Sequence, residues 1–543
     1  MNKRKFPIIV ALVVIVAASK TTAQLNGGAD NEIRAYTSNL PFPMPPITLP
    51  EIPDHRVSIT EFGAVPDGHT MNTKAMNDAI SACAKQGGGT VVIPSGMWLT
   101  GPIRFESNIE LRIDAGALVL FTPKFEEYPM PARGARVTSP ISGTRLTNIA
   151  ITGKGVFDGN GQYWRPVKKE KLTDRQWKDL VASGGVVTSD GRMWWPSREA
   201  MNGEQYLRKL RTETKKPTPE QIAGAREFLR PTMVDFTDCK NVLIDGPTFT
   251  NTPGWVLHPS NCENLIIRNT NVVNNWWGQN TDAADIGGCK NVLFYRNVLD
   301  VGDDGICMKS GPNREREFAL ENIVIADCIV YHAHGGFVIG SNTDGGMRNI
   351  SVKNCVFIGT DIGLRFKSAH DRGGKVQNIF VDGIRMKDIA TSAILFDMYY
   401  DGNGDFDQSK AKIPVFRDFD IKNVFCDGAR DAVFVRGLAE APIQNISLTN
   451  ISISSDRAMS MEEAEGFTLK NVWLNFKSGP VLSVKNARNI NLETITTAVP
   501  PELYVKATGS RTEKIQVERS EASKAKRDVD LGVDVPKGAV IFK

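Results

Sequence analysis

The sequence lacks a net charge once its first residues are set aside. The whole chain has 65 Lys and Arg residues against 61 Asp and Glu residues, a formal charge of +4. Residues 1–23 hold four basic residues (Lys3, Arg4, Lys5 and Lys20) and no acidic one, so the rest of the chain sums to zero. A balanced chain has no overall field to attract a polyanion or an anionic bilayer. We therefore expect no nucleic-acid partner, and no membrane association once the leader is removed.

Long apolar runs are also absent, apart from one near the N-terminus. Three basic residues precede an apolar stretch over residues 6–18, and small residues follow at 21–23. This order is typical of a signal peptide, and the stretch is shorter than the ~20 residues that a transmembrane helix needs. The sequence predicts a signal peptide over residues 1–23, a mature chain that begins near Gln24, and export to the periplasm or the exterior. The alternative interpretation of this segment is a membrane anchor.

The cysteine pattern excludes two common kinds of site. None of the eight cysteines forms a CxxC pair, so a zinc ribbon or a thioredoxin-like site is not expected. Six of the eight fall between residues 239 and 355 at nearly regular steps. This regularity favours small apolar residues that recur in a repeat over a disulfide framework. With no cluster of metal ligands in the sequence, we expect no metal and no cofactor.

What the chain does contain is a repeat of Asn, then Val, Ile or Leu, then any residue, then usually an apolar one. Apolar and variable positions alternate within each copy, as they do in a strand. Successive copies between 241 and 378 are 23, 27, 31, 27 and 29 residues apart, which is typical of a solenoid. The sequence predicts an all-β fold, a right-handed parallel β-helix whose Asn side chains form a ladder at the turns. The copies begin at Asn108, Asn148, Asn241, Asn264, Asn291, Asn322, Asn349, Asn378, Asn423, Asn445, Asn471 and Asn489.

The rest of the chain divides around this solenoid. A helix is expected over residues 72–85, followed by three glycines, as a cap on the open N-terminal end. Residues 24–55 are rich in proline and form an extended lead-in, residues 56–505 form the β-helix, and residues 506–543 form a tail in which the repeat is lost. We expect the protein to be a monomer.

One segment interrupts the repeat. Residues 162–232 hold 15 Lys and Arg against 9 Asp and Glu, together with four of the nine tryptophans. Helical patterns occur at 173–182 and 219–229. The segment is either a solvated surface insertion or the wall of a cleft that offers positive charge and aromatic faces to an anionic sugar.

Polar residues recur at one-rung intervals in the most regular part of the repeat. Asp282 and Asp303 are 21 residues apart, Asp304 and His334 are 30 apart, and His334 and Arg365 are 31 apart. Because parallel strands stack ~4.8 Å apart, residues one rung apart lie side by side. This arithmetic places three carboxylates, an imidazole, a guanidinium and the ammonium of Lys367 on one face. Crowded carboxylates raise at least one pKa, which favours a functional role.

Hydrolysis of a glycosidic bond is the chemistry that fits this set. One carboxylic acid protonates the leaving oxygen, and a second carboxylate activates water or attacks carbon. A cationic pair such as Arg365 and Lys367 would hold a carboxylate of the substrate, which indicates a uronic-acid polymer. The glycines at 302 and 305 would let both Asp303 and Asp304 reach solvent, which a regular strand does not allow.

These motifs resemble the polygalacturonase family of pectin-degrading enzymes, glycoside hydrolase family 28. The likeness covers residues 56–505 apart from the insertion, and it implies a right-handed parallel β-helix that hydrolyses with inversion. The matching elements are NTD (280–282), GDD (302–304), HG (334–335), RFK (365–367), FGAVPDG (62–68) and GGGTVVIPSG (87–96).

The resemblance implies a role for each matching residue. Asp303 would be the general acid, Asp282 and Asp304 would activate water, and His334 would tune the protonation of the acid. Asn280 and Tyr399 would contact the substrate, while Arg365 and Lys367 would bind its carboxylate. Tyr400 is a competing alignment for the tyrosine, and His332 is a second candidate for the histidine.

The function implied is cleavage of α-1,4-galacturonosyl linkages in pectin, with a pectic polysaccharide as the partner. We expect the insertion to close one end of the cleft and make the enzyme exo-acting. The alternatives are a rhamnogalacturonan hydrolase of the same family, a pectate-lyase-like enzyme, and a β-helical glycan-binding protein without activity. Inversion also requires the two carboxyl groups to lie ~6.5–9.5 Å apart, so that water fits between them.

Overall fold

The computed structural model describes residues 31–130, 137–312, 316–400, 412–518 and 524–543. The predicted signal peptide therefore lies outside the described residues. Within these ranges, we find no helix with the length and apolar character needed to cross a membrane.

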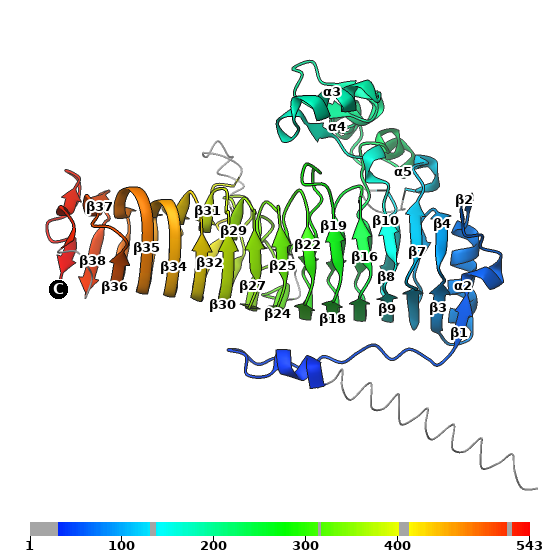
Figure 1. Cartoon of the computed structure of the whole chain (residues 1–543), viewed down its shortest axis with the longest axis horizontal. Helices are drawn as coiled ribbons and strands as arrows, with labels where there is room; N and C mark the ends of the chain where they lie inside the picture. The colour runs from blue at the N-terminus through cyan, green and yellow to red at the C-terminus, as the bar shows by residue number, and fades with distance from the viewer. Residues whose placement is uncertain (1–30, 131–136, 313–315, 401–411, 519–523) are drawn as a thin grey trace, which may run out of the picture.

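The described chain is a right-handed parallel β-helix in which each rung contributes one strand to each of three parallel ladders (Figure 1). The first ladder contains β1 (Arg56–Ser58), β3 (Gly89–Ile93), β6 (Ile109–Ile113), β9 (Thr147–Gly153), β15 (Lys240–Asp245), β18 (Glu263–Arg268), β21 (Lys290–Tyr295), β24 (Leu320–Ala326), β27 (Met347–Lys353), β30 (Lys375–Lys387), β32 (Val415–Asp427), β34 (Ile443–Glu462), β35 (Ala464–Lys485), β36 (Arg488–Thr497), β38 (Glu513–Glu518) and β40 (Val540–Phe542). The predicted fold class is thus confirmed.

The second ladder lies beside the first and shares its longest strands. It contains β2 (Asp67–Met71), β4 (Gly96–Thr100), β7 (Ala117–Phe121), β10 (Val156–Asp158), β16 (Thr248–Thr250), β19 (Asn271–Val273), β22 (Val298–Asp300), β25 (Ile329–Tyr331) and β28 (Val356–Ile358), and continues through the later parts of β30, β32, β34, β35 and β36. These long strands bend at the corner between the two ladders without losing their hydrogen bonds.

The third ladder carries the polar column predicted from the rung intervals. It contains β5 (Ile103–Arg104), β8 (Ile141–Thr144), β14 (Val234–Thr237), β17 (Leu257–Ser260), β20 (Ala284–Gly287), β23 (Ile306–Lys309), β26 (Phe337–Ile339), β29 (Ile362–Lys367), β31 (Ser392–Asp397), β33 (Asp431–Arg436), the ends of β34 and β35, β37 (Leu503–Thr508) and β39 (Arg527–Leu531). Parallel pairing continues to the end of the chain, although the Asn-centred repeat stops at residue 489.

The predicted asparagine ladder is present and explains the repeat. Each of these asparagines has a positive φ, which Asn tolerates better than most side chains. From Asn148 to Asn378, the side-chain amide of each donates to the Asn of the preceding rung. Seven such bonds of 2.9–3.3 Å follow one another from Asn148 to Asn378. The series then breaks, because Asn423 donates to Asp382 instead. The ladder fixes the rung register and so the alignment of the polar column.

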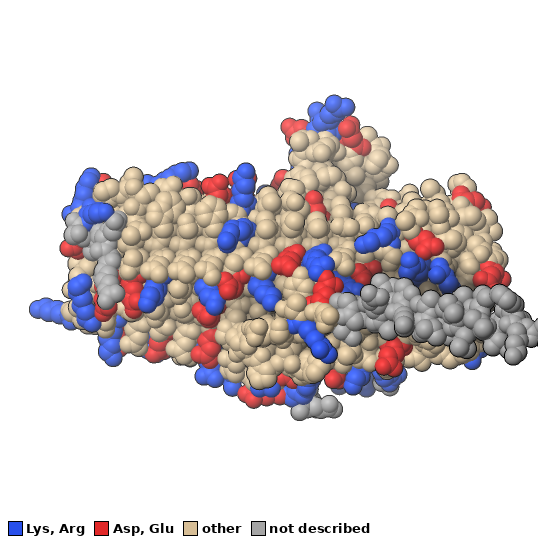
Figure 2. Space-filling model, turned by 60° about the horizontal axis from the view of Figure 1, so that its bottom comes forward, with Lys and Arg blue, Asp and Glu red and all other residues tan. Residues whose placement is uncertain are grey.

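The interior is filled by stacked apolar residues, and the cysteines belong to it. All eight are buried free thiols, and the backbone N–H of Cys262 donates to the sulfur of Cys289 one rung away. The interpretation as recurring small apolar residues is confirmed. On the face shown in Figure 2, basic and acidic side chains are interspersed, in keeping with the balanced charge.

The open N-terminal end of the solenoid is capped by helix α2 (Thr73–Lys85), as predicted. Its apolar face, which includes Met76, Ile80 and Cys83, is buried on the first rungs. The 3₁₀ helix η1 (Ile59–Phe62) lies before β2, which precedes α2, and a second 3₁₀ turn, η2 (Phe125–Glu127), lies further along the chain.

The described part of the lead-in begins with a helical turn over residues 31–37 and then runs extended along the first ladder (Figure 1). Ile33 and Ile47 are buried against outward-facing apolar side chains of β15, β18, β21 and β24. The segment thus covers an apolar stripe that would otherwise face solvent.

The insertion forms a partly helical lobe that projects from one side of the solenoid (Figure 1). It contains η3 (Gly161–Tyr163), η4 (Lys169–Lys171), α3 (Asp174–Ala182), α4 (Arg198–Glu213), α5 (Pro219–Ile222), η5 (Ala223–Ala225), and a three-stranded antiparallel sheet of β11 (Val167–Lys168), β12 (Val186–Val187) and β13 (Met193–Trp195). Helix α4 was not predicted, because Asn202 and Gly203 interrupt its helical pattern; Gly203 lies where Phe228 packs too closely for a side chain.

Two arginines attach the insertion to the solenoid. Buried Arg165 donates to the carbonyl of Thr252 and to Asn251 Oδ1, and burial, followed by the charge of Arg230, lowers its pKa to about 10. At the other end, Arg230 donates to the carbonyl of Gln279 and so reaches the turn that precedes β20. The lobe is therefore joined to the loops that border the third ladder.

Candidate active site

A cavity of about 410 Å³ lies over the third ladder, where the polar column was predicted. Its walls come from both the solenoid and the insertion, and they carry more cations than carboxylates. The lining residues are Lys168, Lys171, Trp255, Trp277, Gly278, Gln279, Asn280, Asp282, Gly302, Asp303, Asp304, Lys309, His334, Ser341, Asn342, Arg365, Lys367, Arg372 and Tyr400.

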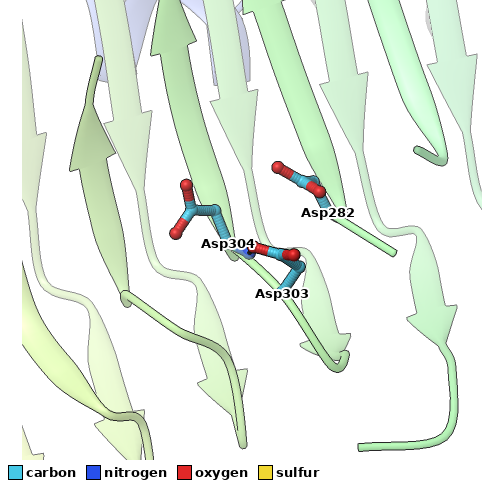
Figure 3. Close-up of side chains that lie close together, drawn as sticks. All are labelled: Asp282, Asp303 and Asp304. Carbon is cyan, nitrogen blue, oxygen red and sulfur yellow. Dashed lines mark hydrogen bonds between the residues drawn. The ribbon is translucent and has the colours of Figure 1, made fainter. Parts of the chain in front are cut away.

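The three carboxylates come from turns at the start of two neighbouring strands (Figure 3). Asp282 precedes β20, and Asp303 and Asp304 precede β23. Asp303 and Asp304 lie in the turn and point in different directions, so both reach the cavity. One oxygen from each of the three lies within 4.8 Å of the others. The nearest oxygens are thus closer than the ~6.5–9.5 Å spacing expected for inversion, and this geometry does not by itself indicate the stereochemical outcome.

Glycine is required at position 302 because the turn leaves no space for a side chain. A Cβ on Gly302 would lie 2.4 Å from the carbonyl oxygen of Gly278, well inside van der Waals contact. The two turns are further joined by buried Thr281, whose hydroxyl donates to the Gly278 carbonyl and accepts from the Gly302 N–H. The NTD and GDD motifs therefore form one packed unit that sets the separation of their carboxylates.

Asp303 is the most accessible of the three acids and lies beside His334. Its Oδ1 lies 3.1 Å from Nδ1 of His334, and its Oδ2 accepts the backbone N–H of Asn280 at 3.2 Å. The other ring nitrogen of His334 lies 3.7 Å from the carboxylate of Asp361. The side chain of Asn280 accepts from Arg230 of the insertion.

Asp304 is buried and held by the two cations of the RFK motif. Its Oδ1 accepts from Arg365 at 3.0 Å and its Oδ2 from Lys367 at 2.7 Å. Burial alone would raise the pKa of Asp304, but the charges of Lys367, Arg365 and Lys309 outweigh it and hold this pKa well below its usual range. Asp304 is therefore expected to be ionised across the pH range in which most proteins work.

Asp282 lies in the opposite electrostatic environment. It is buried, and burial together with the carboxylates of Asp285 and Asp303 raises its pKa well above the usual range. Its Oδ1 accepts no hydrogen bond from the described residues. Two neighbouring carboxyls with pKa values displaced in opposite directions are typical of an acid–base site.

Comparison with known proteins agrees with this geometry. The family model "Glycosyl hydrolases family 28" matches residues 168–471, and a model of rhamnogalacturonase A/epimerase, pectate lyase-like proteins matches residues 56–119. The first match covers more than half of the chain. The chain belongs to glycoside hydrolase family 28.

Individual relatives are similar to this family 28 hydrolase over most of its length. An exo-poly-alpha-D-galacturonosidase of Dickeya chrysanthemi is 27% identical over 475 residues, which cover 81% of this chain and 75% of the relative. An endo-polygalacturonase of Pectobacterium carotovorum is 24% identical and covers 71% of this chain and 84% of the relative. The crystal structure of a hyperthermoactive exopolygalacturonase from Thermotoga maritima has a TM-score of 0.61 and 28% identity, and the match covers 86% of this chain and 96% of that one.

The structure of this family 28 hydrolase places the two candidate tyrosines, and the two candidate histidines, differently with respect to the cavity. Tyr399 does not line the cavity; its ring packs against Arg436 and the core. Tyr400 lines it, with its ring centroid 4.8 Å from the ammonium of Lys367. The chain leaves β31 just before these residues, so strand alternation does not decide which tyrosine faces the site. The candidate His332 pairs with Asp300 at 2.9 Å, away from the cavity.

Sequence reasoning missed several residues of this hydrolase site. Lys309 lines the cavity, pairs with buried Asp285 at 3.1 Å, and lies 5.1 Å from the ring centroid of Trp255. Asp285 belongs to the NTDAAD segment, and its neighbour on the next rung is Cys307. Lys309 lies two residues after Cys307. Counting residues from rung to rung could therefore have placed Asp285 and Lys309 near each other. Lys168 and Lys171 come from the insertion, and no repeat spacing places them at the site.

The ion pair of Asp285 and Lys309 gives a test of the pH dependence of this hydrolase. Asp285 raises the pKa of Asp282 and Lys309 lowers it. The predicted role of Asp282 in activating water requires its ionised form. Activity should therefore fall as pH drops through the raised pKa of Asp282. In Asp285→Asn this pKa falls, so the acidic limb of the kcat/KM profile moves to lower pH. In Lys309→Met it rises, so the limb moves to higher pH. Thermal melts identify folded variants, and limbs that move in the same direction would contradict the assignment.

Proposed function

We propose that this hydrolase releases galacturonate units from the ends of α-1,4-linked galacturonan chains in pectin. The observation that carries the proposal is the placement of Arg365 and Lys367 beside the three carboxylates in one cavity. A cationic pair next to the hydrolytic acids selects a sugar that itself carries a carboxylate. Tyr400 offers a ring face to the same sugar.

The residues divide into two roles. Asp303, which is accessible and adjacent to His334, protonates the leaving oxygen. Asp304, held ionised by its two cations, and Asp282, with one unpartnered oxygen, position and deprotonate the attacking water. The resemblance to family 28 implies that this water attacks from the face opposite the leaving group, so that the anomeric centre inverts.

The insertion supports action at chain ends. Lys168 and Lys171 line the same cavity as the acids, so the lobe bounds the cleft along one side. Arg165 and Arg230 fix both stems of the lobe to the cleft loops. In this proposal the lobe closes one end of the cleft, so that a polymer can insert its terminus but cannot pass through. The exo-acting relatives named above agree with this proposal.

Product sizing on polygalacturonate tests the proposal. We expect galacturonate monomer from the first minutes, a slow fall in viscosity, and no ladder of intermediate oligomers. The first-released anomer should be β, as inversion of an α-linkage requires, which proton NMR reads directly. Random mid-chain cleavage would contradict exo action. Unsaturated products that absorb in the ultraviolet would indicate a lyase, and activity confined to rhamnogalacturonan fragments would change the substrate.

The setting of this reaction is also part of the proposal. The signal peptide predicted over residues 1–23 would deliver a monomeric enzyme to the periplasm or the exterior, where pectic polysaccharide is met. The balanced charge of the remaining chain leaves substrate attraction to local charge in the cleft.

A further inference from the structure

The cleft holds more positive charge than the catalytic acids need. Six cations line it against three carboxylates. Arg365 and Lys367 are paired with Asp304, and Lys309 is paired with Asp285 beneath the cavity. Arg372 pairs with its neighbour Asp371 at 3.5 Å. The two remaining cations, Lys168 and Lys171, come from the insertion.

Lys168 and Lys171 have little compensation. In the described part of the chain, Lys171 has no carboxylate within 4 Å, and its ammonium lies 5.8 Å from the ring centroid of Trp276. Lys168 approaches only Glu170, at 3.9 Å, and the side chain of Glu170 is 75% exposed. An exposed ion pair of this length contributes almost nothing to stability. The two ammonium groups are therefore available to a ligand.

The turn that carries these lysines is held in place. Lys168 ends β11, which pairs with β13, and the N–H of Lys169 donates to the carbonyl of Arg192. Trp194 of β13 is buried and donates to the carbonyl of Gly184. A rigid mount limits the entropy lost when a side chain binds a ligand, so this turn is suited to recognition.

We infer that Lys168 and Lys171 form a second carboxylate-binding subsite, for the galacturonate unit next to the one that Arg365 holds. This inference rests on the proposed function and deepens it. One uronate would be bound from the solenoid floor and its neighbour from the insertion wall, with the linkage between them presented to the acids. Through this subsite the insertion would discriminate between galacturonate and its methyl ester, because the ester lacks the negative charge that the lysines bind.

The subsite is tested by measuring kcat/KM of variants that lack one lysine charge on galacturonate trimers of defined esterification. Trigalacturonate is compared with trimers that carry a methyl ester on one unit at a time. Lys171→Met is expected to lower kcat/KM on trigalacturonate by about tenfold, the order of a charge-assisted hydrogen bond, mainly through KM. On the trimer esterified at the unit that meets the lysines, wild type should fall to the level of the variant, and the variant should lose nothing more. Lys168→Met should act in the same way, with a smaller effect.

The matched control is Lys178→Met, which removes the same charge from α3 of the same lobe, outside the cavity. It should leave kcat/KM unchanged, and an equal loss would show that only the long-range field matters and overturn the subsite. Calorimetric titration of trigalacturonate into Asp303→Asn and into Asp303→Asn/Lys171→Met gives a readout without turnover; equal affinities would also overturn it. If wild type neither cleaves nor binds trigalacturonate, the proposed function fails and not the subsite alone.

Discussion

Asp303→Asn is expected to lower kcat on polygalacturonate by about 10²–10⁴-fold, the usual contribution of a general acid. The amide keeps the size of the side chain but cannot donate a proton to the leaving oxygen. The residue is only partly buried and makes no ion pair with a Lys or Arg among the described residues, so the free energy of unfolding should change little. Binding of trigalacturonate should be preserved, which calorimetry checks in parallel with the rate.

A matched control is available three residues earlier. Asp300 has the same side chain and also contacts a histidine, His332, but lies outside the cavity. Asp300→Asn should keep wild-type kcat. If Asp303→Asn retained more than a tenth of wild-type activity, Asp303 would not be the proton donor. Asp282, whose pKa is raised by burial and by the neighbouring carboxylates, would become the candidate acid.

The fold was readable from the sequence because a solenoid is repetitive. One asparagine per rung marks the turn, and the same asparagines form the hydrogen-bonded ladder that holds the register. Rung counting then placed the carboxylates, His334, Arg365 and Lys367 on one face, and the structure gathers them in one cavity. Local spacing was sufficient there because each strand pairs with the next rung in sequence.

The position of the insertion and the direction of the two tyrosines could not be predicted, because they depend on contacts that the residue spacing of the repeat does not encode. The insertion reaches the cleft through Arg165 and Arg230, which contact segments some 50 to 90 residues away. Its lysines could be counted in the sequence but not placed. Tyr399 and Tyr400 differ in direction because the chain leaves the regular ladder there, where alternation no longer applies.

Lys367→Met should be the most destabilising change at the site. Lys367 and Asp304 are both almost fully buried and 2.7 Å apart. Removal of Lys367 leaves buried Asp304 with Arg365, at 3.0 Å, as its remaining ion-pair partner among the described residues, so the cost should lie toward the lower end of the ~3–5 kcal/mol that breaking a buried pair costs. Urea denaturation at neutral pH measures this loss. The double variant Asp304→Asn/Lys367→Met, which removes both charges, should be more stable than the single variant.

The pH dependence of this loss separates the ion pair from simple packing. The depressed pKa of Asp304 contributes stability that is present above the unfolded value, about 3.9 for Asp, and is lost as pH falls through the lower folded value. The gap between wild type and Lys367→Met should therefore shrink as the pH is lowered below ~4. Lys375→Met, which breaks an exposed 3.0 Å pair with Glu317, should cost less than ~1 kcal/mol. A gap for Lys367→Met that stays constant with pH would show that lost packing, and not the charge of Asp304, accounts for it.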